Sequence, residues 1–292
     1  MNAMKKSALA AAAAAMLGFA ASASADVVVD LFADPTGGQS VSTSTLGATD
    51  NNQVGPFPTT SIVGGYRDIS ITKTADNNGS VDVGNASLVV DTGTLVQSND
   101  LGVKSKGVIT WDGSNNAGAG GLTPNTVGLG GVDFTAGGGA TEFLAQVLQA
   151  DLGFDYKIQV WDMDGHSSTL SAGVQFPVTS PSTAHYLFDW FNLGNGNYCD
   201  GVATAPVDPL AFQCADPSTQ LGFRIDRSGL GGDIDFSSIG ALQLTLENAS
   251  TYSVDLALGS IRSIPEPSAL ALVGLALLGA GVARRSRRSV ES

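Results

Sequence analysis

The strongest constraint on the fold is an alternation of apolar residues near the end of the chain. Every second position is apolar over residues 242–246 and again over residues 252–258, at Leu242, Leu244, Leu246, Tyr252, Val254, Leu256 and Leu258. Successive side chains of a β-strand point to opposite faces, so a period of two is typical of strands with one buried face. The pattern predicts two strands, and the segment Asn248-Ala249-Ser250 between them predicts a hairpin turn.

Shorter apolar runs recur along the chain, separated by Gly, Asn and Asp. They cover residues 27–32, 66–74, 87–91, 108–111, 143–148, 156–161, 169–176, 186–191 and 222–225. No part of the body sustains a helical period over three turns, and the neighbours of the ambiguous segment 141–150 favour a strand. The sequence therefore predicts an all-β fold, a jelly-roll-like β-sandwich, as one domain over residues 26–263.

Composition favours turns over helices. The 292 residues include 37 Gly and carry a net charge of −13. Residues 26–263 hold 25 acidic residues, 23 of them Asp, against 8 basic residues, a net charge of −17. Asp side chains compete for nearby backbone groups and so favour turns. A chain this poor in Lys and Arg is not expected to bind nucleic acid, because phosphate contacts need clustered cations.

The first 25 residues predict a secretory signal peptide. Two lysines precede the apolar run 8–21, and the small residues Ala23 and Ala25 stand where signal peptidase requires them. The run is short for an uncleaved membrane anchor. We expect export and cleavage by signal peptidase after Ala25, with Ala21-Ser22-Ala23 as the alternative cleavage site.

Residues 264–292 contain three parts in a fixed order. Pro265, Glu266 and Pro267 come first, an uncharged apolar stretch over 268–283 follows, and the basic cluster Arg284, Arg285, Arg287 and Arg288 comes last. As a helix the stretch spans about 24 Å, short of the ~30 Å hydrocarbon core, but flanking arginines can snorkel. The basic cluster stays cytoplasmic by the positive-inside rule. The pattern predicts a transmembrane helix that holds the precursor in the inner membrane.

This C-terminus resembles the PEP-CTERM sorting signal of Gram-negative bacteria in Pro265, Glu266 and Pro267, in the apolar run 270–282 and in the arginine cluster. The resemblance implies recognition by an exosortase, a membrane cysteine protease-transpeptidase. Such an enzyme would cut near the motif and release or transfer the body to the cell surface or the extracellular matrix. The alternative is a plain C-terminal anchor with an incidental Pro-x-Pro.

Cys199 and Cys214 are 15 residues apart within the stretch 192–217, which has the character of an insertion. Two cysteines in an exported protein most often form a disulfide, and we expect one here. A reactive thiol is the alternative, and it would need a nearby base.

Two groups of aspartates are candidate ligands for a structural Ca²⁺. Asp162 and Asp164 precede Gly165, and Asp233 and Asp235 follow a run of glycines. Calcium prefers hard oxygen ligands. The first motif lacks the further ligands of an EF-hand, so an Asp/Gly turn at the end of a strand is the alternative interpretation.

Catalytic motifs are missing from the sequence. The body has only Glu142 and Glu247 as glutamates and His166 and His185 as histidines, and His185 is expected to be packed. Neither a Gly-x-Ser-x-Gly elbow nor a His-Glu-x-x-His zinc motif occurs. We therefore expect a protein that is not an enzyme.

Several aromatic residues could form a sugar-stacking platform, or they could be core residues. They are Trp111, Tyr156, Trp161, Tyr186, Trp190, Phe191 and Tyr198, the last in a polar loop. The main hypothesis is an exported, non-catalytic surface or matrix protein. The alternatives are a carbohydrate-binding module that recognises extracellular polysaccharide, and an extracellular hydrolase.

Overall fold

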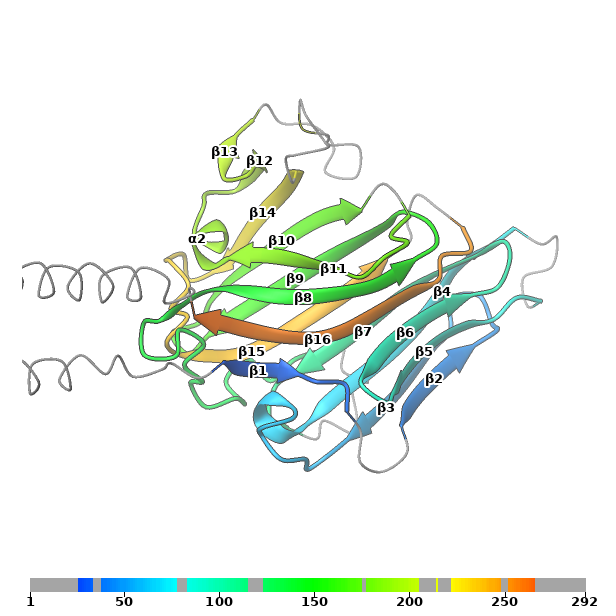
Figure 1. The fold of residues 1–292 in the computed structure, drawn as a ribbon, viewed down its shortest axis with the longest axis horizontal. Coiled ribbons are helices and arrows are strands. Elements are labelled where there is room, and N and C mark those ends of the chain that lie inside the picture. The colour runs from blue at the N-terminus through cyan, green and yellow to red at the C-terminus, as the bar shows by residue number, and fades with distance from the viewer. Residues whose placement is uncertain are drawn as a thin grey trace, which may run out of the picture.

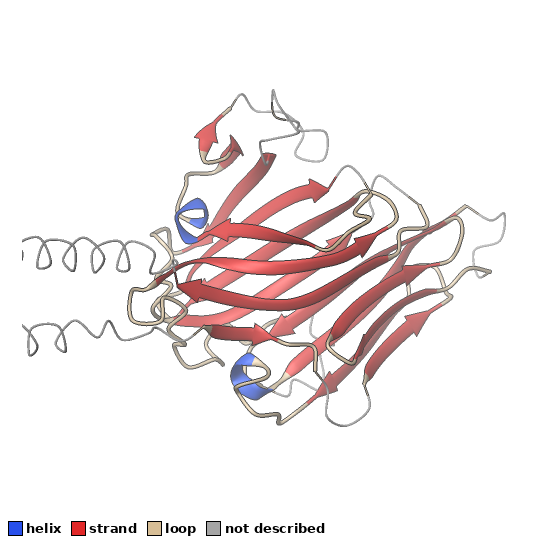
Figure 2. Cartoon of the chain, viewed as in Figure 1, coloured by secondary structure: helices blue, strands red, loops and turns tan. Residues whose placement is uncertain are grey.

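Two antiparallel β-sheets pack face to face in the computed structural model of this chain (Figures 1 and 2). The residues that the structure describes are 26–33, 38–77, 83–114, 123–174, 177–204, 214, 222–247 and 252–265. Within them the only helical elements are the short η1 (Val63–Gly65) and α2 (Phe188–Phe191). The predicted all-β sandwich is confirmed.

Seven described strands form one sheet, with β1 beside β16 and the other strands in the order β11-β8-β16-β6-β5-β2. They are β1 (Val27–Asp30), β2 (Gln39–Thr43), β5 (Ala86–Asp91), β6 (Thr94–Asn99), β8 (Ala140–Ala150), β11 (Ser182–Leu187) and β16 (Leu256–Pro265). The segment 141–150, which was ambiguous in sequence, is strand β8.

Nine described strands form the other sheet, in the order β13-β12-β14-β10-β9-β15-β7-β4-β3. They are β3 (Thr49–Val54), β4 (Arg67–Asp76), β7 (Val103–Trp111), β9 (Phe154–Asp162), β10 (His166–Val174), β12 (Gly196–Cys199), β13 (Val202–Ala203), β14 (Gly222–Gly229) and β15 (Ile239–Glu247). The first half of the expected insertion 192–217 thus extends this sheet.

The core lies between the two sheets and follows the period of two. Leu242, Leu244 and Leu246 of β15 are all buried, and they face Phe143 and Leu258 from the opposite sheet across one hydrophobic cluster. Each buried side chain of this size contributes about 1.5–3 kcal/mol relative to exposure. The alternation in the sequence therefore identified the inward face of β15 correctly.

The predicted hairpin between residues 242–246 and 252–258 is wrong. β15 pairs with β7 and β9, whereas β16 pairs with β6, β8 and β1 in the other sheet. Each of the two strands pairs with neighbours on both sides and buries one apolar face. Because β15 and β16 lie in opposite sheets, their apolar faces pack into the same core. Residues 248–251 lie outside the described part of the chain.

The predicted strand 186–191 is correct only at its beginning. β11 ends at Leu187, and Phe188–Phe191 form the helix α2. Residues three apart share one helical face, so Phe188 and Phe191 both reach the core. Phe188 stacks on Phe236 with ring centroids 4.1 Å apart, and Phe143 meets Phe188 edge-on at 4.9 Å. A strand would have turned one of the two rings toward solvent.

The first and last described strands lie side by side. Val27 of β1 is opposite Ser263 of β16, and Arg262 Nη1 lies 3.6 Å from Asp26 Oδ2. The start of β1 and the end of β16 therefore share one end of the sandwich (Figure 1). None of the helices in the described ranges is long and apolar enough to cross a membrane. The expected signal peptide and sorting helix fall outside those ranges.

Candidate functional site

The Asp-x-Asp-Gly motif forms the turn between β9 and β10. Asp162 ends β9, and its carboxylate oxygen Oδ1 accepts hydrogen bonds from the backbone N–H groups of Asp164 at 3.0 Å and His166 at 2.9 Å. Gly165 has φ +85°, a left-handed conformation that glycine adopts without strain. The turn therefore closes around the Asp162 side chain, which has no exposed surface.

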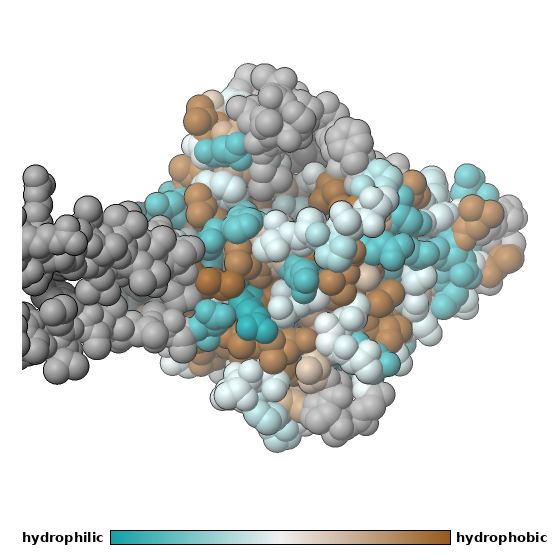
Figure 3. All heavy atoms as spheres, viewed as in Figure 1, coloured by the Kyte–Doolittle hydropathy of each residue, from teal (hydrophilic) through white to brown (hydrophobic). Residues whose placement is uncertain are grey.

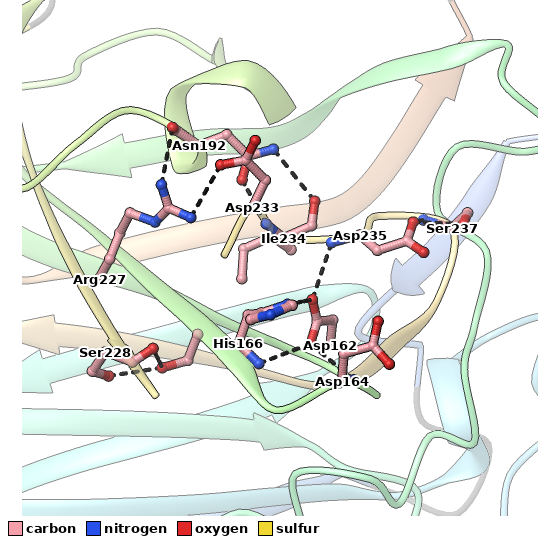
Figure 4. A network of polar contacts seen from close by, with 11 residues as sticks. Asp162, Asp164, His166, Asn192, Arg227, Ser228, Asp233, Ile234, Asp235 and Ser237 are labelled. Atoms are coloured by element: carbon pink, nitrogen blue, oxygen red, sulfur yellow. Dashed lines mark hydrogen bonds and ion pairs between the residues drawn. The ribbon is translucent and has the colours of Figure 1, made fainter. Parts of the chain in front are cut away.

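The second oxygen of Asp162 joins this turn to the loop before β15. Oδ2 accepts a hydrogen bond from the Asp235 N–H at 3.1 Å and lies 2.8 Å from His166 Nδ1 (Figure 4). Burial raises the pKa of this carboxyl, but the hydrogen bonds from Asp235 and His166 outweigh it and hold the pKa below its usual value. Asp162 is thus an ionised structural group that ties two loops together.

The other three candidate calcium ligands have different partners. Asp233 Oδ1 pairs with Arg227 Nη2 at 3.1 Å, and Asp235 Oδ1 accepts hydrogen bonds from the N–H and the hydroxyl of Ser237 (Figure 4). Asp164 is exposed. Among the described residues no group of three or more His, Cys, Asp or Glu side chains could hold a metal ion. The four aspartates are near one another without forming a ligand set, so the observed turn fits the alternative interpretation better.

Asn192 completes this network. Its side-chain oxygen accepts from the Ile234 N–H at 2.6 Å, its amide nitrogen donates to the Ile234 carbonyl, and its backbone carbonyl accepts from Arg227 Nη1. The network thereby connects the end of α2 with β14 and the loop 230–238. The sequence motif pointed to Asp162, but nothing in it pointed to Asn192, which lies 30 residues further along the chain.

A second acidic pair, on β4 and at the end of β7, was not predicted. The Asp68 side chain is buried, and neither of its oxygens accepts a hydrogen bond of regular geometry. Burial and the nearby Asp112 raise the pKa of Asp68 to about 7, and the Gln53 amide on β3 offsets this only partly. Asp112 in contrast accepts hydrogen bonds from Ser114 and from the Asn125 N–H. Asp68 is therefore a buried carboxyl whose pKa is raised to near neutral pH.

The two histidines each pair with one carboxylate. His166 Nδ1 contacts Asp162, and His185 Nδ1 lies 3.0 Å from Glu142 Oε2. The prediction that His185 is packed is wrong, because 57% of its side chain is exposed. β11 is an edge strand of the described sheet, and alternation turns His185 outward while Tyr186 faces the core. No hydroxyl or thiol in the described part of the chain hydrogen-bonds either imidazole.

Most of the candidate sugar-stacking aromatics are core residues. Trp111, Tyr156, Tyr186, Phe191 and Tyr198 are all buried. The expectation that Tyr198 lies exposed in a polar loop is wrong, since it sits on β12 and stacks against Phe223 with centroids 5.8 Å apart. Trp190 is half-buried and stacks on the same Phe223 at 4.6 Å. Trp161, half-buried on the outer face of β9, is the member of the set that fits a sugar-stacking role.

Cys199 and Cys214 form the predicted disulfide, with their Cα atoms 5.8 Å apart. Cys199 ends β12, so the bond attaches the following segment to the edge of the nine-stranded sheet. Both cysteines are buried, and the described part of the chain contains no free thiol. The alternative of a reactive thiol does not apply to a cysteine held in a disulfide.

The sorting motif begins inside a strand. β16 ends at Pro265, which is opposite Ala140 of β8, and the Ser263 hydroxyl donates to the Phe134 carbonyl. Glu266, Pro267 and the four arginines lie outside the described residues, as do Ala23 and Ala25. The outer surface over β8 and β16 mixes polar and apolar residues (Figure 3).

Comparison with protein families identifies this C-terminal segment. Residues 263–288 match the family described as the PEP-CTERM protein-sorting motif, so the chain carries this motif at its C-terminus. The motif implies an exported protein that is made as a membrane-anchored precursor and processed by an exosortase. None of the curated proteins matches the chain.

Solved structures similar to this chain include PfGH50B, a family 11 carbohydrate-binding module and CtCBM11, each at a low TM-score. PfGH50B has 13% identity and a TM-score of 0.35 over 78% of this chain, which spans 24% of PfGH50B. The family 11 carbohydrate-binding module of the cellulase Lic26A-Cel5E of Clostridium thermocellum has 8% identity and a TM-score of 0.34, covering 83% of this chain and 95% of the module. The solution structure of CtCBM11 has 11% identity and a TM-score of 0.36, covering 85% of this chain and 99% of CtCBM11.

Proposed function

We propose that this chain is a non-catalytic exported protein whose β-sandwich reaches the cell surface or the extracellular matrix after an exosortase processes its C-terminus. The PEP-CTERM motif at residues 263–288 is the observation that carries the proposal. We also propose that the β-sandwich has the jelly-roll-like topology expected from the sequence.

The position of the motif in the fold supports this function. The motif starts at Ser263 in β16, a strand held between β8 on one side and β6 and β1 on the other, and β16 ends where Pro265-Glu266-Pro267 begins. Cleavage after Pro265 would leave every described strand whole. Proline has no backbone N–H and a fixed φ, so a Pro-Glu-Pro segment resists continuing a helix into the processing site.

The proposal is tested by changing the motif and leaving the sandwich intact. In the native host, the Glu266→Ala/Pro267→Ala double variant is compared with the wild type by membrane fractionation and intact-mass measurement. We expect the wild-type mass to lack both terminal segments, and the variant to keep its C-terminus and remain in the membrane fraction. Asp164→Ala, which removes an exposed carboxylate from the body, is the control. A motif variant that matures and localises like the wild type would rule the proposal out.

Carbohydrate binding is the second candidate function, and Trp161 favours it. Gln159 and Gln243 are opposite each other on β9 and β15, and Thr169 of β10 is opposite Gln159. By alternation these polar side chains share the outer face with Trp161. An aromatic ring beside amides and hydroxyls can stack on a sugar ring and hydrogen-bond its hydroxyls. A glycan array with the full chain, its Trp161→Ala variant and an EDTA arm tests this. The absence of Trp161-dependent binding in every arm removes the candidate.

A further inference from the structure

A cavity of about 390 Å³ lies between the two sheets under strand β11. Its wall combines inward-facing residues of β8, β9, β11, β15 and β16, including Phe143, Ala145, Tyr156, Ala184, Tyr186 and Leu244. We call this space the inter-sheet cavity. It is separate from the Asp162 network, from Trp161 on the outer face and from the sorting motif.

Small side chains in register create the cavity. Ala184 of β11 is opposite Ala145 of β8, and Ala145 is opposite Ile261 of β16. Packed sheets lie about 10 Å apart, and an alanine methyl group cannot fill its half of that distance. Large residues such as Phe143 and Leu258 flank the alanines and fill their part of the core. The space is therefore a property of two particular positions and not of loose packing throughout.

The wall offers almost only hydrocarbon to an occupant. The hydroxyls of Tyr156 and Tyr186 hydrogen-bond each other, so they do not require a polar partner from a ligand. A buried water needs two to four polar partners, and an apolar cavity of about 150 Å³ in another protein stays dry and binds benzene. The inter-sheet cavity is larger and lies within the roughly 300–1,000 Å³ typical of small-molecule sites, so an apolar molecule fits it better than water does.

The cavity reaches the surface beside α2. Its wall includes Trp190, the exposed Asp200 and His185, whose side chain is 57% exposed. Among the described residues, acidic groups near this opening include Asp200 in the cavity wall and Glu142, which contacts His185, and residues 26–263 carry a net charge of −17. An anionic headgroup would be repelled there, whereas a neutral group would not.

We propose that the inter-sheet cavity binds a neutral single-chain lipid, with its hydrocarbon chain between the sheets and its uncharged end at the opening near His185 and Asp200. This binding activity does not depend on the exosortase-based function proposed above.

The test is a fluorescence titration of the full chain with N-phenyl-1-naphthylamine, a neutral apolar probe that brightens in an apolar site. We expect saturable binding that falls about tenfold or more in the Ala145→Leu/Ala184→Leu variant, which fills the cavity. Ala257→Leu on β16, absent from the cavity wall, is the matched control and should bind like the wild type. The apolar terminal segments are the same in all three proteins, so they cannot account for a difference. Below its solubility limit 1-dodecanol should displace the probe, and dodecanoate at pH 8, below its micelle-forming concentration, should do so about tenfold less well.

Equal probe binding by the wild type and a folded Ala145→Leu/Ala184→Leu variant would overturn the proposal, and so would the absence of saturable binding. A second measurement serves if the filled variant does not fold. Trp111 and Trp190 line the cavity, so in a Trp161→Phe background their emission should be quenched saturably by 1-bromododecane. Unsaturable or absent quenching in that protein would also overturn it. Displacement by dodecanoate as effective as by 1-dodecanol would overturn the assignment of a neutral ligand.

Discussion

The carboxylate of Asp30 on β1 and the guanidinium of Arg67 on β4 form an ion pair inside the sandwich. Arg67 Nη1 lies 3.0 Å from both oxygens of Asp30, and neither side chain has any exposed surface. Asp30 also accepts hydrogen bonds from Trp111 Nε1 at 2.8 Å and from the Phe32 N–H at 2.6 Å. Because β1 and β4 belong to different sheets, the pair holds the N-terminal strand to the opposite layer.

Removing one member of this pair should destabilise the fold strongly. Arg67→Met leaves the Asp30 carboxylate buried without its cation, and we expect the free energy of unfolding to fall by about 3–5 kcal/mol. Urea denaturation of the full chain measures it. In a double-mutant cycle with Asp30→Leu, the combined variant should be less destabilised than the two single changes added together. Strict additivity would show that the two charges do not interact.

Asp68 should make stability fall as the pH rises. Its pKa is about 7 in the folded protein, above the usual carboxyl value near 4, so the folded state keeps a proton that the unfolded state loses. The contribution of Asp68 to the free energy of unfolding is fully present below about pH 4 and is lost as the pH rises to about 7. Asp68→Asn should therefore stabilise the protein at pH 8 by about 1–2 kcal/mol, allowing for solvent screening, and should have no such effect at pH 4.

Thermal unfolding at both pH values provides the measurement for Asp68. Asp91→Asn changes an exposed aspartate and should be neutral throughout. A stabilisation of Asp68→Asn that is the same at pH 4 and pH 8 would contradict the assigned pKa.

Asp162 should contribute stability in the opposite pH range. Its pKa is lowered in the folded state, so its contribution is present above about pH 4 and is lost as the pH falls through the folded pKa. Asp162→Ala leaves several N–H donors without an acceptor and should cost about 1–3 kcal/mol at pH 7. The difference from the wild type, measured by urea denaturation, should shrink on acidification. Asp164→Ala, at the exposed position of the same turn, should be close to neutral, and an equal loss there would contradict this role.

Loss of the Cys199–Cys214 disulfide should reduce stability by about 3 kcal/mol, the chain-entropy value for a 15-residue loop. The Cys199→Ser/Cys214→Ser variant and the wild type are compared by thermal unfolding with and without reductant. Reductant should lower the transition of the wild type only. A wild-type transition that reductant does not move would mean that the bond adds nothing to stability.

The strands predicted from sequence are those with a clear apolar face, such as β4, β5, β7, β9 and β15. The strands β2, β3 and β6 were missed because their sequences, QSVST, TDNNQV and TLVQSN, are largely polar. Their pairing with neighbours supplies what their composition does not, since Gln39 to Thr43 match Val90 to Ala86 residue by residue. Backbone hydrogen bonds form whatever the side chain, so strand identity there depends on tertiary partners.

The candidate sites also differ in whether the sequence alone could predict them. The Asp162 turn and the disulfide were visible as local motifs, because their groups are close in sequence or of one rare type. Asp68 near Asp112 and Ala145 beside Ala184 are separated by about 40 residues each, and only strand register brings them together. Local patterns carry no information about such register.

By itself the sequence determined the β architecture, the disulfide and the PEP-CTERM motif, because alternation, cysteine count and the order of terminal segments are local properties of the chain. Only the tertiary structure decided which sheet each strand joins. The apolar residues of β16 are compatible with a hairpin to β15 and also with a position in the opposite sheet. The opposite sheet is the observed position, because there the apolar faces of β15 and β16 are buried against each other. The register of β11 on β8 was likewise decided by the tertiary structure, and it placed Ala184 opposite Ala145 beside the inter-sheet cavity.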